Sequence, residues 1–293
     1  MNRFSVVSYG YSASRWLAFA LSTHSDVFVA HGTYEIDSVI EGCFEAERTR
    51  GISGERLDPL TRGRTNLELK KLSLSELYAI YERSFPSKAV FGNVHTFVPR
   101  ELYYKEDFNA ISPKVFHLVR NPFQFIKSHM SGVIQAEAVP ELSTHYSTFF
   151  ELFCSRFPHV LELEWFDKHS IEQKAFFTSC YTLFNLAQDL RRYGPLMRTI
   201  QMEKMTTDIM YAIQTCEDIT GLKYSTEDMR PLIDSGAINQ HKSTSSHLDH
   251  SFESWHDWQK EGFTSVMSKE LYVFLKTLGY ALPDLTFQYD YFD

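Results

Sequence analysis

The fold is decided by three consecutive segments near the start of the chain: FSVVS (residues 4–8), YGYSASR (residues 9–15) and WLAFAL (residues 16–21). The first has the pattern of an apolar strand, the second of a small-residue turn and the third of a helix start. Backbone N–H groups at a helix N-terminus have no partner within the helix, and the helix dipole adds partial positive charge there. The turn is therefore a candidate cradle for phosphate or sulfate, to which Ser12 and Ser14 could add hydroxyl donors.

The turn differs from a Walker P-loop, in which a Lys-Ser/Thr pair brings an ammonium to the terminal phosphates and a hydroxyl to magnesium. No such pair follows Gly10 in the sequence. This difference argues against an ATP-driven enzyme. For this segment alone, an ordinary strand-to-helix turn with serines as N-caps is an equally good interpretation.

A second strand-to-helix junction carries an arginine. The run VFHLV (residues 115–119) is continuous and apolar, as in a buried parallel strand, and RNP (residues 120–122) follows it. Proline suits the first turn of a helix, so we expect Arg120 at the carboxyl end of a strand, where ligands of open α/β sheets bind. Its guanidinium fits a phosphate and Ser128 could supplement it, although an arginine at such a place is also typical of a surface ion pair.

Together the two junctions resemble the sulfotransferase superfamily, whose members bind 3′-phosphoadenosine-5′-phosphosulfate (PAPS). Residues 9–16 are similar to that family's Tyr-Pro-Lys-Ser-Gly-Thr-Thr-Trp turn, which holds the 5′-phosphosulfate. Residues 120–122 and Ser128 resemble its Arg-Asx-Pro and serine, which hold the 3′-phosphate. The cofactor-binding residues that the resemblance implies are Tyr11, Ser12, Ala13, Ser14, Arg15 and Trp16 in the turn, together with Arg120 and Ser128.

The turn departs from the family frame at two positions. Tyr11 stands where the family has a lysine that neutralises charge on the bridging oxygen as the sulfuryl group leaves, and Ala13 stands where it has glycine. The first change removes a cation from the place where negative charge develops in the transition state. We hypothesise that Arg15 or Lys242 supplies the cation instead.

His95 is the candidate general base. It follows the apolar run at residues 89–94 and precedes Thr96 and Pro99, which resembles the family's Thr-His-Leu-Pro segment. In that family the histidine takes the proton from the acceptor hydroxyl. Imidazole suits this role because its ordinary pKa lies near operating pH. The chain has twelve histidines, so composition alone would not single out this one.

Apolar strands alternate with helical segments along the chain. Strands are expected near Phe4, Val27, Val90, Val115 and Ile200, which predicts an α/β fold with a mainly parallel central sheet flanked by helices. The resemblance implies, more narrowly, a sulfotransferase fold of the P-loop-nucleotide-hydrolase-like kind. We expect one domain over residues 1–293, with residues 45–71 as a mobile insertion or lid, or as a plain solvated loop.

Other segments have a structural and a functional interpretation. A helix at residues 73–85 presents an apolar face that is expected to be core, and one C-terminal helix is expected through Val266, Leu271 and Leu278. Aromatic residues on helical stretches would line an acceptor pocket if the resemblance holds, but core packing is the better expectation for each ring. They are Phe149, Phe150, Phe176, Phe177, Tyr181 and Phe184. The histidines between residues 241 and 256 match no zinc pattern, and no metal is expected.

The net charge of −8 and a pI near 5.8 disfavour nonspecific binding to nucleic acid or anionic membranes. The sequence shows neither a secretory signal nor a membrane-spanning run, and its four cysteines are scattered. A cytoplasmic protein with reduced thiols fits these features best. Oligomeric state is not determined by the sequence.

The hypothesis that follows is a PAPS-dependent sulfotransferase that moves a sulfuryl group to the hydroxyl of a small-molecule acceptor by in-line displacement, leaving 3′-phosphoadenosine-5′-phosphate (PAP). One alternative is a P-loop-type kinase or other phosphoryl transferase. Another is a catalytically silent binding protein with the sulfotransferase fold, which the substitution at Tyr11 keeps open. The sequence does not identify the acceptor.

Overall fold

The structure is a computed structural model that describes residues 2–9, 13–31, 71–105, 114–136, 140–160, 170–234 and 252–287. The chain divides into two compact units, Met1–Val119 with Leu196–Gln240, and Arg120–Pro195 with His241–Asp293. A single domain over the whole chain stays a prediction. The insertion expected at residues 45–71 lies, apart from Lys71, outside the described residues.

The first unit is built on a parallel sheet. Its strands are β1 (Asn2–Val7), β2 (Val27–His31), β3 (Val90–Val94), β4 (Lys114–Val119) and β5 (Arg198–Gln201), in the order β2-β3-β1-β4-β5. Every pair of neighbours is parallel, so all carboxyl ends meet at one edge. The predicted α/β class and all five predicted strands are confirmed. Ligands of such sheets bind outside the carboxyl ends of the strands, at the point where the strand order reverses. In this sheet that point lies beside the central strand β1.

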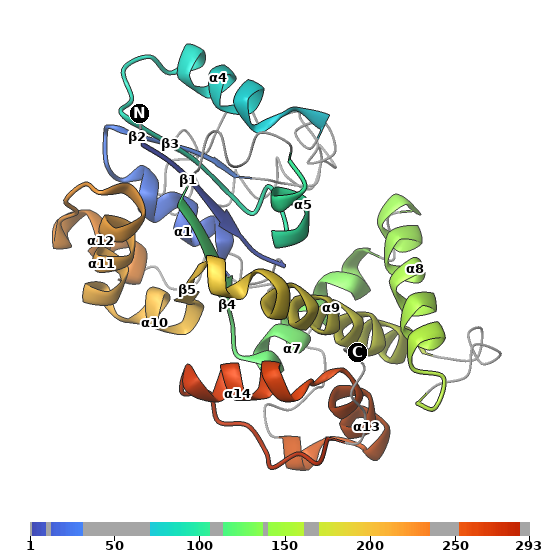
Figure 1. Ribbon diagram of the computed structural model, residues 1–293. Coiled ribbons are helices and arrows are strands. Elements are labelled where there is room, and N and C mark those ends of the chain that lie inside the picture. The colour runs from blue at the N-terminus through green and yellow to red at the C-terminus, as the bar shows by residue number, and fades with distance from the viewer. Residues whose placement is uncertain are drawn as a thin grey trace. The chain divides into compact units, whose positions relative to one another are not determined.

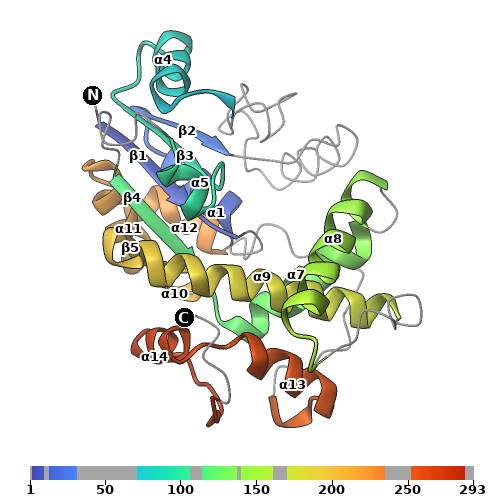
Figure 2. The ribbon, with the colours of Figure 1, turned by 45° about the vertical axis from the view of Figure 1, so that its right-hand side comes forward.

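Helices cover both faces of this sheet. Figures 1 and 2 show α4 (Leu74–Ser84) on one side, and α1 (Ser14–Ser22), α11 (Ile209–Thr220) and α12 (Thr226–Asp234) on the other. The short helices α5 (Pro99–Tyr103) and α10 (Met202–Thr207) follow β3 and β5. Two-sided cover explains why the strands are nearly continuous apolar runs instead of alternating ones.

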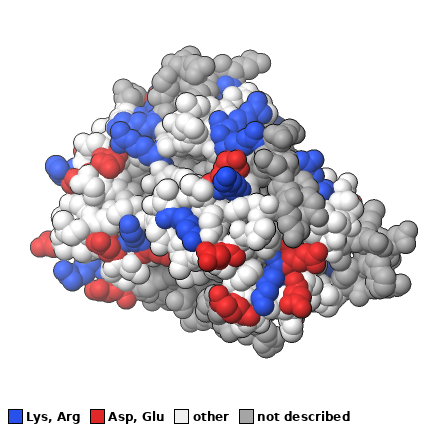
Figure 3. Space-filling model, turned by 60° about the horizontal axis from the view of Figure 1, so that its bottom comes forward, with Lys and Arg blue, Asp and Glu red and all other residues white. Residues whose placement is uncertain are grey.

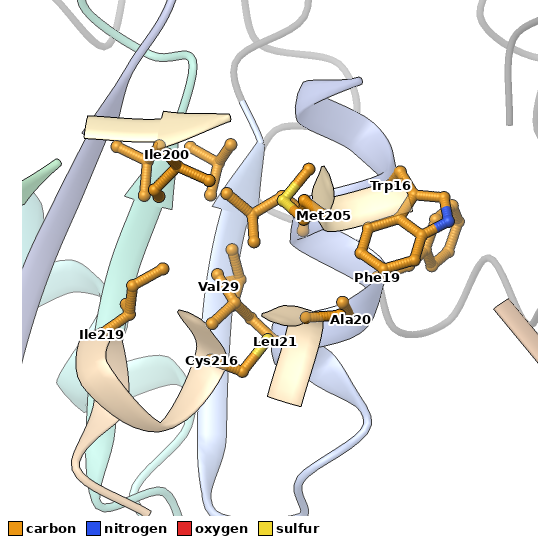
Figure 4. Packing of buried hydrophobic residues seen from close by; sticks show 14 of the residues in the cluster. Trp16, Phe19, Ala20, Leu21, Val29, Ile200, Met205, Cys216 and Ile219 are labelled. Atoms are coloured by element: carbon orange, nitrogen blue, oxygen red, sulfur yellow. The ribbon is translucent and has the colours of Figure 1, made fainter. Parts of the chain in front are cut away.

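The core beneath α1 is formed by side chains from distant parts of the sequence. Figure 4 shows Trp16 and Phe19 of α1 with Met205 of α10, and Cys216 of α11 near Val29 of β2. All five side chains are almost fully buried in one cluster. Helix α1 and the helices after β5 therefore stabilise each other.

The opposite core contains the predicted helix face. Leu74, Leu77, Tyr78 and Tyr81 of α4 are all fully buried, as their spacing predicts. The helix starts at a capping box in which the Ser73 hydroxyl accepts from the backbone N–H of Glu76. The structure thus confirms a packing role for this face.

One close approach sets the register of β1 against β3. Phe4 lies opposite Gly92, and a Cβ at position 92 would lie 2.1 Å from the Phe4 ring. Only glycine leaves room for the ring there. The register brings the end of β3 level with the end of β1, where the backbone N–H of His95 donates to the Val6 carbonyl at 2.8 Å.

The second unit is helical among its described residues. The long helix α9 (Ile171–Tyr193) contacts α7 (Pro122–Ala136), α8 (Pro140–Arg156), α13 (Asp257–Val266) and α14 (Lys269–Thr277). Phe150, Phe176, Phe177 and Phe184 are buried, whereas Phe149 and Tyr181 are partly exposed. Core packing is therefore confirmed for four of the six aromatic residues.

The prediction of a single C-terminal helix is wrong, because the structure has two helices there. The apolar pattern is divided between α13 and α14, because Met267 has extended backbone and the Ser268 hydroxyl accepts from the N–H of Leu271 to start a new helix. A serine inside the periodic pattern was the signal for this break.

Candidate active site

The turn after β1 ends in a residue with unusual backbone. Ala13 is the N-cap of α1 and has a left-handed conformation, with φ of 55°. Its side chain makes no capping hydrogen bond, so the serine N-cap that the alternative interpretation requires is not found at this position. The helix then begins at Ser14, followed by Arg15 and Trp16. Tyr11 and Ser12 lie outside the described residues, so the structure says nothing of their expected roles.

His95 has the same rare backbone. It follows β3 directly with φ of 60°, and Ala13 and His95 are the only residues other than glycine with positive φ in the described part of the chain. A left-handed conformation is costly for a residue with a side chain, and such outliers gather at functional sites. Both outliers here lie after the carboxyl ends of adjacent strands.

A backbone carbonyl determines the tautomer of His95. The Nδ1 atom lies 3.1 Å from the Ser8 carbonyl oxygen. Because a carbonyl can only accept, Nδ1 carries the hydrogen, and the basic lone pair of the neutral ring lies on Nε2. The ring is partly buried. This is the arrangement that a general base requires.

A second histidine, which the sequence did not single out, lies beside His95. His31 is the last residue of β2, and its ring centroid is 5.9 Å from that of His95. Its Nε2 atom is 3.1 Å from the hydroxyl oxygen of Ser14, and the residue is 4% exposed. The sequence signal for His31 was a polar residue at the end of an apolar strand. His95 directly follows such a strand in the same way.

Arg15 brings positive charge to this pair of histidines. Burial lowers the pKa of His31 well below its ordinary value, and the charges of Arg15 and His95 lower it further. His31 is therefore neutral at physiological pH. Arg15 is itself buried, with 8% exposure, and a buried cation in the first turn of a helix is suited to a charged ligand.

Trp16 has a structural role through its side chain. The indole is fully buried, and Nε1 donates to the Leu232 carbonyl at 3.3 Å. Any contact of Trp16 with a ligand would therefore come from its backbone N–H.

Arg100 of α5 places a further cation near the end of β1. Its Nη2 donates to the Tyr9 hydroxyl at 3.3 Å.

Arg120 and Ser128 meet in the second unit. Arg120 follows β4 directly, and its Nη1 donates to the Ser128 hydroxyl at 2.7 Å. The Asn121 side chain accepts from the backbone N–H groups of Phe123 and Gln124 at 3.0 and 3.3 Å, and so caps α7. The two residues expected to bind phosphate thus contact each other within this unit. Lys242 lies outside the described residues.

On the face shown in Figure 3, acidic and basic side chains of the described residues are interspersed. Within the described ranges, no group of three or more His, Cys, Asp or Glu residues could hold a metal ion. A search of the same ranges found no helix of the length and apolarity needed to span a membrane.

Comparison with known proteins finds similarity among solved structures. No family model matches the sequence. No curated protein matches it either. Among solved structures, the sulfotransferase domain from the Synechococcus PCC 7002 olefin synthase is similar over 96% of both chains, with a TM-score of 0.41 and 15% identity. The α/β architecture itself rests on the strand order and the covering helices described above.

Proposed function

We propose that the chain is a PAPS-dependent sulfotransferase that transfers the sulfuryl group to an acceptor hydroxyl. The observation that carries the proposal is the fixed tautomer of His95 beside the start of α1. A base with its lone pair on Nε2 lies at the same sheet edge as the N-terminus of a helix that suits an anion.

The proposed reaction is an in-line displacement at sulfur. The acceptor oxygen attacks the sulfur while Nε2 of His95 removes the hydroxyl proton. The bond between sulfur and the bridging oxygen breaks, and its electron pair stays on the 5′-phosphate of the PAP product. No redox partner is needed, and the proton taken by the imidazole is returned to solvent in the next cycle.

The start of α1 is proposed to hold the phosphosulfate end of PAPS. First-turn N–H groups and the Ser14 hydroxyl are neutral donors, and Arg15 supplies the positive charge that Tyr11 cannot. For the junction between β4 and α7 we propose the 3′-phosphate, with the guanidinium of Arg120 and the hydroxyl of Ser128 as donors. Lys242 is retained as a second candidate for the missing cation.

Binding and turnover together test this function. PAP and ADP are titrated calorimetrically into the wild type, and PAP release is followed with a panel of phenols, aliphatic alcohols and sugars. We expect PAP to bind much more tightly than ADP and at least one acceptor class to be sulfated. Equal binding of ADP would reject the sulfotransferase, and PAP binding without any turnover would instead support a silent binding protein.

The substitution His95→Asn isolates the base. Asparagine tolerates the left-handed backbone, and its amide N–H can replace Nδ1 as donor to the Ser8 carbonyl, so local structure is kept. Turnover should fall roughly 10²–10⁴-fold, as for the loss of a general base, with the PAP affinity unchanged. His24→Asn is the control, because His24 precedes β2 at the opposite edge of the sheet. Full turnover in His95→Asn would remove His95 from the mechanism.

A further inference from the structure

His31 has no role in the proposed reaction, although its ring contacts the first residue of α1. It is buried at the end of β2, and the contact of its Nε2 with the Ser14 hydroxyl joins the second strand to the first residue of α1. Histidine is an uncommon residue to bury in this way, because an apolar residue would end the strand at lower cost. The contact with Ser14 is the feature that distinguishes it.

The direction of this hydrogen bond follows from the other ring nitrogen. Nδ1 of His31 has no hydrogen-bond partner among the described residues. A buried N–H without an acceptor is rarer than a buried acceptor without a donor, because an acceptor tolerates incomplete pairing better. The single hydrogen of the neutral ring is therefore assigned to Nε2. It follows that His31 donates and the oxygen of Ser14 accepts.

Donation by His31 decides where the Ser14 hydroxyl points. A serine hydroxyl has one hydrogen and rotates to suit its neighbours. If its oxygen accepts from His31, its own hydrogen is directed away from the ring and becomes available to another acceptor. If the ring accepted instead, that hydrogen would be used internally and the oxygen would present only lone pairs to an anion.

We infer that His31 is a positioning residue that orients the Ser14 hydroxyl as a donor to the anion held at the start of α1. The inference rests on the proposed function, since it assigns that anion as the 5′-phosphate or phosphosulfate of the nucleotide. A neutral ring also suits the site, because a charge on His31 would repel Arg15 and would disfavour the protonation of His95.

The test uses PAP and adenosine 3′-monophosphate, which lacks the 5′-phosphate. His31→Leu removes the donor, Ser14→Ala removes the hydroxyl, and the double variant removes both. We expect each single variant to weaken PAP binding roughly five- to tenfold, corresponding to about 1–1.4 kcal/mol for one hydrogen bond. The double variant should be no weaker than Ser14→Ala. Binding of adenosine 3′-monophosphate should not change in any of them.

Rescue by a conservative variant separates positioning from packing. The amide of His31→Gln places an N–H near the position of Nε2, whereas the shorter amide of His31→Asn reaches only the position of Nδ1. Glutamine should restore PAP affinity to within about twofold of the wild type and asparagine should not. The comparison of glutamine with asparagine tests the positioning role of His31 even if His31→Leu does not fold. Equal affinities for glutamine and asparagine, or additive losses in the double variant, would overturn the inference.

Failure of the inference is distinguishable from failure of the proposed function. If the wild type binds PAP and the His31 variants match it, the nucleotide site stands and the positioning role is wrong. If the wild type does not bind PAP, the same variants are titrated with inorganic pyrophosphate. Coupled losses of pyrophosphate affinity would then support the role of His31, and no binding by the wild type would overturn both proposals.

Discussion

The carboxyl ends of β1 and β3 hold polar groups in a different way from the junction of β4 with α7. At the first place, two residues have left-handed backbone, and neutral groups are fixed by backbone carbonyls and by His31. At the second, the backbone follows an ordinary helix start, and the polar group is a guanidinium bonded to Ser128. The first place combines this backbone geometry with the cations Arg15 and Arg100, whereas the second combines one guanidinium with an ordinary helix start. Substitutions should therefore have different consequences at the two places.

Removing the charge at the β4–α7 junction should have the largest effect. Arg120→Ala should weaken PAP binding by about 2–4 kcal/mol, roughly 30- to 1,000-fold, because hydrogen bonds from a charged donor are among the strongest in proteins. Calorimetry measures the change. Arg191→Ala, at an exposed position of α9, removes the same charge elsewhere in the unit and should leave affinity unchanged. An unaltered dissociation constant for Arg120→Ala would show that this junction does not bind the phosphate.

A buried neutral group within β4 should affect stability in acid. Burial lowers the pKa of His117 to about 3, and neither ring nitrogen has a hydrogen-bond partner among the described residues. Below the ordinary pKa of 6.5 the unfolded chain binds a proton that the folded protein does not, so the free energy of unfolding falls by up to about 1.4 kcal/mol per pH unit. His117→Leu should remove this part of the loss between about pH 6 and pH 4, while being neutral or stabilising at about pH 7.

Urea denaturation at several pH values checks this. Thr96→Val is the matched control, because the Thr96 hydroxyl is equally buried and without a partner among the described residues but does not titrate. The control should keep the slope of the wild type. An identical slope for His117→Leu would mean that the imidazole is not held neutral, and that β4 carries no buried neutral group comparable to His31.

Substitutions of Ala13 test the backbone geometry of the turn after β1. Ala13→Val should lower the free energy of unfolding by about 1–2 kcal/mol, because a β-branched residue fits the left-handed region poorly. Ala13→Gly should change it by less than about 1 kcal/mol in the stabilising direction, since relief of strain is partly offset by the entropy of glycine. Chemical denaturation measures both. A valine variant as stable as the wild type would argue against a strained turn.

The smallest effect is expected at Ser128. Ser128→Ala should weaken PAP binding by about 1 kcal/mol, roughly fivefold, without loss of stability, because alanine favours a helix. Ser131→Ala, on the same helix, removes a hydroxyl that donates to the Lys127 carbonyl, and should leave PAP binding unchanged. If both variants bind PAP like the wild type, Arg120 alone accounts for the affinity at this junction.

The strands and the main packing faces could be predicted because buried strands and helix faces require apolar residues at regular spacing. Continuous apolar runs at Val27, Val90 and Val115 have no other good interpretation in a chain of alternating strands and helices. The face of α4 was equally clear. The division between α13 and α14 was not, because apolar spacing continues across Ser268 and only its capping hydroxyl marks the break.

The candidate site was predictable only where a local motif names the residue. Ser14, His95 and the pair Arg120 and Ser128 follow from turns that the sequence displays. His31 does not, since its role depends on a contact between the end of β2 and the start of α1, seventeen positions apart in sequence. A contact of this kind is created by strand order, which no local pattern encodes.

The glycine opposite Phe4 has a consequence for how this chain can evolve. A side chain at position 92 would clash with the Phe4 ring and displace the ring or the paired backbone. The Val6 carbonyl of β1 and the Ser8 carbonyl just after β1 accept from His95, so such a displacement would move His95 relative to these partners. We therefore expect position 92 to tolerate no residue other than glycine. A stability screen would score such a substitution as a core defect, and under the proposed function a turnover assay would score it as loss of the proposed base.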